Sequence, residues 1–403
     1  MKDKVSVCKK NDLRLKKIEL SKLKGESMSP WPEKYVIGLT GNIATGKSVV
    51  RKMLEHMGAY GIDADALSHR VMAKGAPGFQ PIVDYFGRWV LDSEGQIDRK
   101  RLGGIVFANP KALAKLESII HPFVRQAISI LAQRAKQKVI VIEAIKLVEG
   151  PLKESCDSIW VTDAAPKVQL ARLLKKRKMS EQEAKQRILS QNPQKEKLAH
   201  ADVIINNAGS FEDTWRQVAA AWAKAFPKTD TGPVELAKTQ DGELSVQRAT
   251  PRLAGAIAEF ITKHSDGQKE MTRTDVMEAF GEKAFMVVMS GEELRGVVGW
   301  QVENLVSRVI DFYFAPSLSL KTAVPDLMKE VETASRELQS EAALLFLPAK
   351  LAKSDVWKQM KYEKRAIEDM TVRAWQEAAR ESDIPGTEML FKQLRIDRVL
   401  RPI

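Results

Sequence analysis

The sequence predicts an α/β fold with a parallel sheet flanked by helices, followed by a separate α+β domain with an antiparallel meander. The chain has 403 residues, which is too long for one ordinary domain. Strand-like and helix-like segments alternate between residues 34 and 226. After residue 250, three strand-like segments follow one another without an intervening helix.

The first folded segment, residues 34–226, alternates short apolar runs with amphipathic stretches. The apolar runs predict strands at residues 36–39, 59–62, 138–142, 158–162 and 203–205. Amphipathic patterns predict helices at residues 48–57, 66–73, 79–86, 99–106, 110–135, 166–178, 180–191 and 211–225. Strands separated by helices imply right-handed crossovers, so we expect a parallel sheet covered on both faces.

The second folded segment, residues 251–403, follows a predicted linker at residues 227–250 that is rich in Pro, Gly and Thr. Strands are predicted at residues 284–290, 295–302 and 307–314, and later at 343–347 and 365–372. Helices are predicted at residues 251–264, 273–280, 325–339, 354–360 and 375–380 and over the final residues. Consecutive strands joined by short turns predict an antiparallel meander.

The net charge of +12 is unevenly placed along the chain. Residues 1–34 carry 10 Lys/Arg and 5 Asp/Glu (+5), residues 35–226 carry 29 and 19 (+10), and residues 227–403 carry 25 and 28 (−3). A basic field in the first folded segment suits polyanionic ligands such as nucleotides. The sequence shows no interleaved aromatic and basic signature, so no nucleic-acid partner is expected.

The ends and the cysteines give further expectations. Residues 1–33 are basic and contain two prolines, which predicts a flexible, solvated extension, with contact to an acidic partner as the alternative. The sequence has no apolar run of transmembrane length and no signal-peptide core, so we expect a cytoplasmic protein without a membrane partner. Cys8 and Cys156 are expected to be reduced thiols without a catalytic role. The oligomeric state is left open.

Residues 41–48 read G-N-I-A-T-G-K-S, a complete phosphate-binding loop between a predicted strand and a predicted helix. The helix N-terminus and the glycine-rich turn direct several backbone N–H groups at one anion. Lys47 adds a positive charge for the β/γ-phosphates, and Ser48 offers a hydroxyl to Mg²⁺. The predicted nucleotide-binding residues are Gly41, Asn42, Ile43, Ala44, Thr45, Gly46, Lys47, Ser48 and Val49.

Two carboxylates, Asp63 and Asp65, follow the second predicted strand. In an open α/β sheet this position is at the carboxyl edge, near the place of a bound γ-phosphate. A carboxylate there can accept the proton of an attacking hydroxyl or hold Mg²⁺ through water. The alternative is that one of them, Asp65 above all, caps the helix predicted to start at residue 66.

Further segments make the interpretation more specific. The run IGLTGNIATGKS is followed in order by IDADALSHRV, PGFQPIVDYFG, FANP, IIHPFVR, QLARLLKKR, RILSQ and ADVIINNAG. This series, from about residue 35 to residue 226, resembles the dephospho-CoA kinase family of phosphate-loop proteins. The resemblance implies ATP-dependent phosphorylation of the 3′-hydroxyl of dephospho-CoA, the last step of CoA biosynthesis, with ATP and Mg²⁺ as cofactors.

The resemblance also implies residue roles. Asp65 would be the catalytic base, and Lys47 would act on the phosphates. Arg172 and Arg177 would lie on a lid helix and stabilise the transferring charge, although a solvated helix face that also includes Lys175 and Lys176 is the alternative.

Metal binding and acceptor binding are assigned in the same way. Ser48, Asp63 and Glu143 would hold the metal ion. His121 and Arg125 fall where the acceptor-binding part packs, with a structural role as the alternative for His121. The turn at residues 206–209 would lie near the adenine.

The chain departs from the family pattern directly after the third predicted strand. The family usually has an acid followed by Pro-Leu-Leu and a second acid, whereas residues 143–149 read E-A-I-K-L-V-E. Ile145 and Lys146 stand in place of the proline and one leucine, which implies a changed acceptor site.

The second segment resembles the Gcn5-related acetyltransferase fold in its meander, the helix from residue 325 and the W-K-Q-M-K-Y run at 357–362. In that family a glycine-containing loop after the third meander strand binds the pyrophosphate of acyl-CoA. Residues 315–321 read A-P-S-L-S-L-K, which contains no glycine, and Pro316 has no N–H. We therefore expect residues 251–403 to be a degenerate, non-catalytic relative.

Two other functions stay open at this point. One is a kinase for another nucleoside or small molecule. The other is a nucleotide-binding scaffold without turnover, in which the change at Ile145 and Lys146 has abolished phosphoryl transfer.

Overall fold

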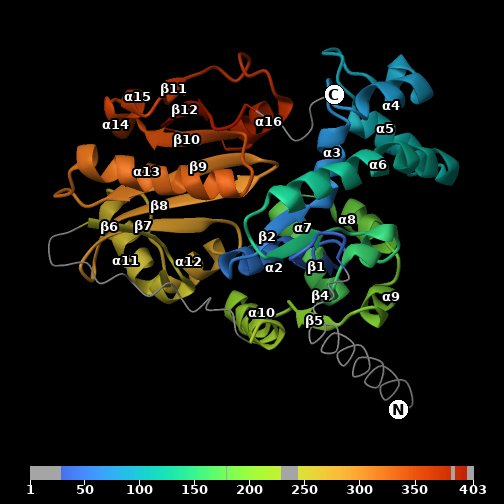
Figure 1. The fold of residues 1–403 in the computed structure, drawn as a ribbon, viewed down its shortest axis with the longest axis horizontal. Helices are drawn as coiled ribbons and strands as arrows, with labels where there is room; N and C mark the ends of the chain where they lie inside the picture. Colours follow the sequence, from blue (N-terminus) through green and yellow to red (C-terminus); the bar gives the residue numbers. More distant parts are fainter. Residues whose placement is uncertain (1–28, 178, 228–243, 383–385, 397–403) are drawn as a thin grey trace.

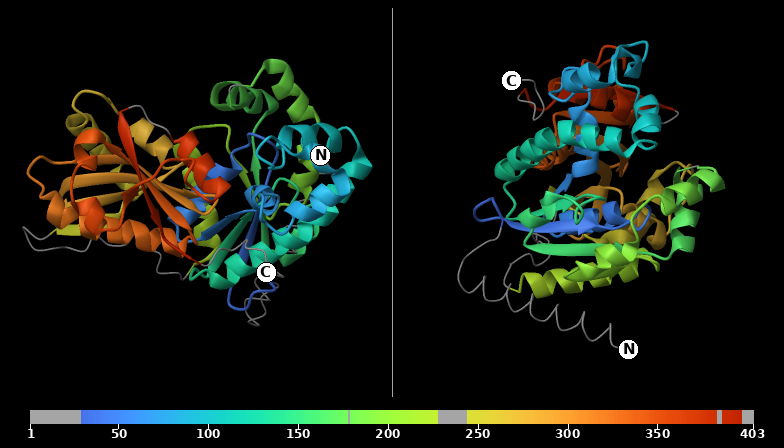
Figure 2. Two further views of the ribbon diagram at one scale, coloured as in Figure 1. Left: turned by 90° about the horizontal axis from the view of Figure 1, so that it is seen from above. Right: turned by 90° about the vertical axis from the view of Figure 1, so that its right-hand side faces the viewer.

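The computed structural model describes residues 29–177, 179–227, 244–382 and 386–396. Two sheets, each covered by helices, lie side by side in the molecule (Figures 1 and 2). Residues 1–28 of the predicted extension, residues 228–243 of the predicted linker and the final residues 397–403 lie outside the described part.

The first sheet is parallel, as predicted, with the order β2-β3-β1-β4-β5. Its strands are β1 (Tyr35–Thr40), β2 (Tyr60–Asp63), β3 (Val139–Glu143), β4 (Ser158–Asp163) and β5 (Val203–Asn206). Pairing places Asp63 opposite Glu143, and Glu143 opposite Leu39 of β1. The carboxyl ends of β1, β2 and β3 therefore meet at the edge where the phosphate loop begins.

Helices cover both faces of this sheet. Their bounds are α2 (Lys47–His56), α3 (Ala64–Val71), α4 (Phe79–Phe86), η1 (Arg88–Val90), α5 (Arg99–Val106), α6 (Pro110–Arg134), η2 (Pro151–Ser155), α7 (Pro166–Arg177), α8 (Glu181–Leu189), α9 (Gln194–Ala199) and α10 (Phe211–Ala225). One apolar cluster joins α2 and α10 to one face through Val50, Trp160 and Val218. A second cluster joins α3, α5 and α6 to the other face.

The end of the predicted extension belongs to the folded part. Trp31 is only 7% exposed and lies in the apolar cluster beneath α6. Its indole Nε1 donates a hydrogen bond of 3.2 Å to Ser129 Oγ. The buried indole ties this segment to α6, so the predicted flexible extension of residues 1–33 is wrong at Trp31.

The second sheet has the order β11-β12-β10-β9-β8-β7-β6, and only the β9–β10 pair is parallel. Its strands are β6 (Leu244–Arg248), β7 (Ala284–Ser290), β8 (Glu293–Glu303), β9 (Val306–Phe314), β10 (Ala342–Pro348), β11 (Glu363–Lys364) and β12 (Thr387–Gln393). The predicted meander corresponds to β7, β8 and β9. Strand β6 falls within the predicted linker at residues 227–250. The linker prediction is therefore wrong for these residues, which pair along β7 at the edge of the sheet.

The helices of the second part are η3 (Pro251–Leu253), α11 (Ala254–His264), α12 (Arg273–Ala279), α13 (Leu320–Glu337), α14 (Ala349–Ala352), α15 (Val356–Gln359) and α16 (Arg373–Glu381). Helix α13 packs on one face of the sheet, and α11 and α12 pack on the other. The strand predicted at 365–372 is wrong, because this segment forms turns such as Asp369 N–H to Ala366 O. The helix predicted for the final residues lies outside the described residues at 397–403. Before them, β12 pairs along the whole of β10, and this strand was not predicted.

In the part of the chain described here, no helix combines the length and the apolar character needed to cross a bilayer. The two domains are in direct contact at the C-terminal end of α2. His56 Nε2 lies 2.8 Å from the carbonyl oxygen of Phe280, and Arg248 Nη2 lies 3.3 Å from His56 Nδ1. The ring of Phe280 packs edge-on against His56. Helix α2 is therefore shared between the core of the first domain and the surface of the second.

Candidate active site

The phosphate loop joins β1 to α2, which begins at Lys47. Gly41, Ala44 and Gly46 all have positive φ, at 148°, 59° and 93°. A Cβ added to Gly46 would lie 1.7 Å from Asn207 Nδ2, so this position requires glycine for space as well as for conformation. The loop thus turns tightly enough to place the first amides of α2 at its centre, as an anion-binding helix N-terminus requires.

Helices α7 to α9 lie against this loop. Arg172 Nη1 donates to Ala44 O at 3.1 Å, and its Nη2 donates to Asn207 O at 2.6 Å. The side chain of Gln191 accepts from the Ile43 N–H at 2.6 Å, and that of Gln194 accepts from the Asn42 N–H at 3.0 Å. Ile43 also packs with Leu173 and Ala184. The predicted lid segment therefore contacts the loop through both polar and apolar side chains.

Of the predicted lid arginines, the structure brings Arg172 to the phosphate loop. Arg177 ends α7, but its side chain lies outside the described residues. The turn predicted near the adenine also reaches the loop, since Asn207 Nδ2 donates to Thr45 O at 2.9 Å. Thr214 Oγ1 in turn donates to Asn207 Oδ1 at 2.9 Å and fixes the orientation of this amide.

Asp63 and Asp65 lie at the carboxyl edge of the sheet, as predicted, but their local roles differ. Asp63 caps α3 by accepting from the Ala66 N–H at 2.8 Å, so the alternative that Asp65 is the cap is wrong. The helix begins at Ala64, which places Asp65 in its first turn. There Asp65 Oδ2 accepts from the Ile145 N–H at 3.2 Å.

The surroundings disfavour the charged forms of both carboxylates. Burial, followed by the negative charge of Asp63, raises the pKa of Asp65 to about 6, while Lys47 acts in the opposite direction. Burial and then the charge of Glu143 raise the pKa of Asp63. A carboxylate with a pKa of about 6 can take up a proton near neutral pH, as a general base must.

Glu143 ends β3 and is held between the phosphate loop and α2. Its Oε1 accepts from Ser48 Oγ at 2.9 Å, and its Oε2 accepts from Arg51 Nε at 2.7 Å. Arg51 Nη1 also donates to Glu55 Oε1 at 2.6 Å, and Lys52 Nζ donates to Glu55 Oε2 at 2.9 Å. These four charged side chains are all buried. We call Arg51, Lys52, Glu55 and Glu143 the buried ion network.

A glycine makes room for the buried ion network. A Cβ on Gly61 of β2 would lie 2.2 Å from Glu55 Oε1 and 2.9 Å from Arg51 Cγ. The absence of a side chain at this position therefore allows the long Arg51 and Glu55 side chains to lie between α2 and the sheet.

The predicted metal ligands Ser48, Asp63 and Glu143 surround the same edge of the sheet. Within the described residues no group of three or more His, Cys, Asp and Glu side chains could hold a metal ion by itself. Two carboxylates and a hydroxyl are instead the sparse set of hard oxygen ligands that suits Mg²⁺, which takes its other ligands from water and substrate phosphates.

The departure from the family pattern falls beside Asp65. The N–H of Ile145 binds Asp65, and its carbonyl oxygen accepts from Thr40 Oγ1 at 3.0 Å. Lys146 points outward and pairs with Glu117 of α6 at 2.7 Å, with 62% of its side chain exposed. His121 and Arg125 are exposed on the same helix. Lys146 therefore fills no apolar position, and the backbone of the altered segment still holds Asp65.

Some site residues were missed by the sequence analysis. Gln194 bonds to the phosphate loop, and Arg51 bonds to Glu143; only the Arg51–Glu55 spacing on α2 is a recognisable signal, typical of an ion pair one turn apart. The position of Gln194 depends on how α7 to α9 fold onto the loop. That arrangement is tertiary and is not encoded in any local pattern.

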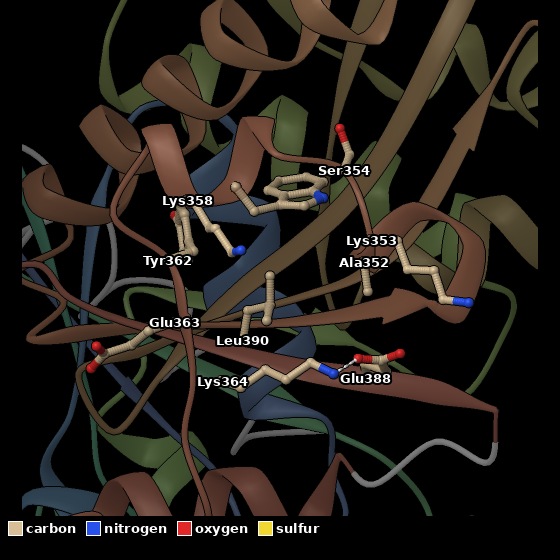
Figure 3. A pocket seen from close by; sticks show the side chains of 10 residues that line it. Ala352, Lys353, Ser354, Lys358, Tyr362, Glu363, Lys364, Glu388 and Leu390 are labelled. Atoms are coloured by element: carbon tan, nitrogen blue, oxygen red, sulfur yellow. Dashed lines mark ion pairs between the residues drawn. The ribbon is translucent and has the colours of Figure 1, made fainter.

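A cavity of about 510 Å³ lies far from this site, in the second domain (Figure 3). It is bounded by α14, α15, β11 and β12, with Leu390 at its floor and the Lys364–Glu388 ion pair at its rim. None of the predicted site residues lines this cavity, so the cavity is not part of the phosphate site.

Comparison with known proteins gives a consistent family. The family model for dephospho-CoA kinase matches residues 35–213. The dephospho-CoA kinase of Geobacter metallireducens is 42% identical over 196 residues, which are 48% of this chain and 98% of that protein. That of Streptomyces avermitilis is 40% identical, covering 46% of this chain and 92% of that protein.

Solved structures with similarity include dephospho-CoA kinase from Campylobacter jejuni, at 28% identity and a TM-score of 0.33, covering 48% of this chain and 98% of that chain. They also include an acetyltransferase of the GNAT family from Staphylococcus aureus, at 10% identity and a TM-score of 0.31, covering 38% of this chain and all of that one.

The matched residues contain the phosphate loop, the Asp63–Asp65 pair and Arg172, which the structure gathers at one edge of the parallel sheet. The sequence relatives are matched over almost their whole length. The chain therefore belongs to the dephospho-CoA kinase family of transferases.

Proposed function

We propose that the chain transfers the γ-phosphoryl group of ATP to the 3′-hydroxyl of dephospho-CoA, giving ADP and CoA. The observation that carries this proposal is Asp65, a buried carboxylate with a pKa of about 6 that faces the Lys47 charge and is held by the Ile145 amide. This is the base that a hydroxyl acceptor requires beside a phosphate loop.

In the proposed reaction each residue has one task. Asp65 accepts the proton of the acceptor hydroxyl as the new P–O bond forms and the β–γ bridge of ATP breaks. Lys47 and the amides of the phosphate loop neutralise the charge on the nucleotide phosphates. Arg172, which lies against the loop through Ala44 O, would stabilise the charge on the same phosphates.

Ser48, Asp63 and Glu143 would hold Mg²⁺. The bound ion would neutralise part of the negative charge on the nucleotide phosphates. The donor set fits, because Ser48 Oγ already lies 2.9 Å from Glu143 Oε1 and the two carboxylates lie on paired positions of β2 and β3. Glu143 would act mainly by orienting Ser48, since Arg51 shares its charge.

The proposal is tested by measuring CoA formation from ATP and dephospho-CoA with the purified full-length chain. We expect turnover that depends on added Mg²⁺ and is abolished by excess EDTA. Lys47→Ala should remove activity, whereas Lys224→Ala, at an exposed position of α10, should not change it. Absence of ATP-dependent CoA formation by the unchanged protein would reject the proposal.

The two open alternatives predict different results in the same assay. A kinase for another small molecule would phosphorylate a nucleoside from an acceptor panel and leave dephospho-CoA unchanged. A scaffold would bind ATP but transfer phosphate to no acceptor. The retained amide contact between Ile145 and Asp65 favours turnover over the scaffold.

For the second domain we propose a non-catalytic role. In the segment after β9 that would have to cradle a pyrophosphate, two amides are already engaged: Ala315 N–H donates to Arg295 O, and Leu318 N–H donates to Ala315 O. Pro316 supplies no donor at all. Acetyl transfer from acetyl-CoA to an amine panel should therefore be undetectable with the full-length chain.

A further inference from the structure

The turn between β8 and β9 reaches from the second domain into the first. Strand pairing of Val302 with Ser307 and of Glu303 with Val306 leaves a two-residue turn, Asn304-Leu305. Both turn residues have positive φ, at 50° and 60°. Such turns favour Asn followed by Gly, because a side chain at the second position is strained. We call residues 302–306 the β8–β9 turn.

The strained residue is buried in the other domain. Leu305 is 8% exposed and belongs to the apolar cluster of the first domain, together with Leu67 and Val71 of α3. Its backbone is held by the second domain, because its carbonyl oxygen accepts a hydrogen bond of 2.7 Å from the Glu341 N–H. A non-glycine residue persists in this conformation only where its surroundings over-determine it, and such strain is concentrated at functional positions.

Polar contacts also join helix α3 to the β8–β9 turn and to Glu341 beside it. Arg70 of α3 donates through Nη1 to Asn304 O and through Nη2 to Glu341 Oε2 at 2.9 Å. Glu341 is fully buried and Arg70 is 10% exposed, so this ion pair is shielded from water. Helix α3 also carries Asp65 in its first turn. One end of the helix therefore bears the proposed base while the other is fixed by the second domain.

The turn also meets the buried ion network. Val302 O accepts from Lys52 Nζ at 3.3 Å, and Lys52 is bonded to Glu55. Glu55 binds Arg51, Arg51 binds Glu143, and Glu143 binds Ser48 of the phosphate loop. A continuous series of charged hydrogen bonds thus joins the β8–β9 turn to the loop, in addition to the contacts with α3.

We propose that the β8–β9 turn is a positioning element of the kinase site, with Leu305 and Arg70 as positioning residues for Asp65. The inference rests on the proposed function, because it takes Asp65 as the base. Loss of the turn's contacts should disturb the base more than the nucleotide, since Lys47 and the loop are also held by β1 and by α7. The expected effect is therefore on kcat rather than on the KM for ATP.

The test compares Leu305→Gly with Leu305→Met in the full-length chain. Glycine keeps the turn conformation without strain but removes the inserted side chain, whereas methionine retains its volume. We expect Leu305→Gly to lower kcat for CoA formation at least tenfold with the KM for ATP changed less than twofold. Leu305→Met should keep kcat within about threefold. Glu292→Gly, in the turn at the opposite end of β8, is the control.

A second variant removes the polar contact without leaving an uncompensated buried charge. Arg70→Met combined with Glu341→Gln should also lower kcat and spare the KM for ATP. It provides the decisive comparison if Leu305→Gly does not fold. A kcat within twofold of the unchanged protein in the folded variants would overturn the proposal.

Hydrogen exchange separates this inference from the proposed function. In Leu305→Gly the amides of residues 64–71 should exchange at least tenfold faster, while those of α10 keep their rates. If the unchanged protein makes no CoA, the proposed reaction fails, but the exchange rates still decide whether the turn holds α3. Unchanged exchange in residues 64–71 would show that it does not.

Discussion

Asp65 illustrates how single residues at this site are set by their surroundings. It lies in the first turn of α3, beside Asp63, and receives one backbone hydrogen bond from Ile145. Burial and the neighbouring carboxylate raise its pKa to about 6. The same surroundings that suit a base for proton uptake also make its charged form costly in the folded protein.

The first prediction concerns activity. Asp65→Asn should lower kcat about 10²–10⁴-fold, because the amide keeps the shape of the side chain but cannot accept the proton. In the unchanged enzyme, kcat/KM should fall as the pH falls through about 6, since the base is then protonated. Steady-state CoA formation between pH 5 and 8 measures both. A pH-independent rate over this range would contradict the role of Asp65.

The second prediction concerns stability. As the pH rises toward 6, activity should increase, whereas the free energy of unfolding should decrease. The pKa of Asp65 is about 6 in the folded chain against an ordinary 3.8, so folding favours the protonated form. The free energy of unfolding should therefore decrease as the pH rises from about 4 to about 6 and stay low above this range. Asp65→Asn should raise it at pH 8 by about 3 kcal/mol. Urea unfolding at pH 4.5 and pH 8 tests this, with the exposed Asp369→Asn as the control.

The sequence was sufficient for the residues whose chemistry is local. The loop motif and the two aspartates after β2 are recognisable from their spacing, because a strand end and a helix start fix where they point. Which aspartate caps α3 was not predictable, since the helix starts two residues earlier than its apolar pattern suggests. Asn207 was recognised only as part of a turn, because its contact with Thr45 spans 162 residues of sequence.

At the scale of elements, the site is an assembly of one loop and the segments packed on it. Gly46 lies at the point of closest approach, where Asn207 and Arg172 both reach the loop. The packing of the loop against Asn207 and Arg172 therefore requires glycine at position 46.

The third prediction uses this dependence. Gly46→Ala should destabilise the fold by about 1–3 kcal/mol and weaken ATP binding at least tenfold, because the φ of 93° is unfavourable and the new Cβ would overlap the Asn207 amide. Gly104→Ala is the matched control. Gly104 lies within α5 with no atom within 4 Å of an added Cβ, so alanine there should stabilise by up to about 1 kcal/mol. Thermal unfolding and nucleotide titration distinguish the two.

Most elements of the first domain followed from their patterns, whereas α9 of that domain and parts of the second domain did not. Buried parallel strands such as β3 are continuous apolar runs that the sequence displays directly. Strand β12 has only three apolar residues in a polar setting, and its conformation is decided by pairing with β10. Strand β6 is likewise specified by β7, so its residues have the composition of a linker.

At the scale of the whole molecule, the two domains share a buried polar contact as well as apolar surface. His56 is enclosed by Trp215 and Phe280, with Arg248 on its other ring nitrogen and the Lys52–Glu55 pair nearby. Burial, followed by the charge of Arg248, lowers the pKa of His56 to about 3. The imidazole is therefore neutral in the folded chain at all ordinary pH values.

The fourth prediction follows from this neutral histidine. Its stabilising effect is fully present above pH 6.5, the ordinary pKa, and is lost progressively as the pH falls toward 3. Between pH 6.5 and pH 5 the free energy of unfolding should fall by about 2 kcal/mol more in the unchanged protein than in His56→Gln. The exposed His200→Gln should behave like the unchanged protein. Equal pH dependence of all three proteins would contradict the assignment.

Gly61 carries a consequence for how this chain can vary. Its missing side chain leaves the space in which Arg51 and Glu55 lie, with an added Cβ only 2.2 Å from Glu55 Oε1. Substitutions at positions 51, 55 and 61 are therefore not independent of one another in evolution. In homologous chains with a larger residue at the position of Gly61, the residues matching Arg51 and Glu55 should both be short or uncharged. Such covariation can be read from an alignment alone, without any purified protein.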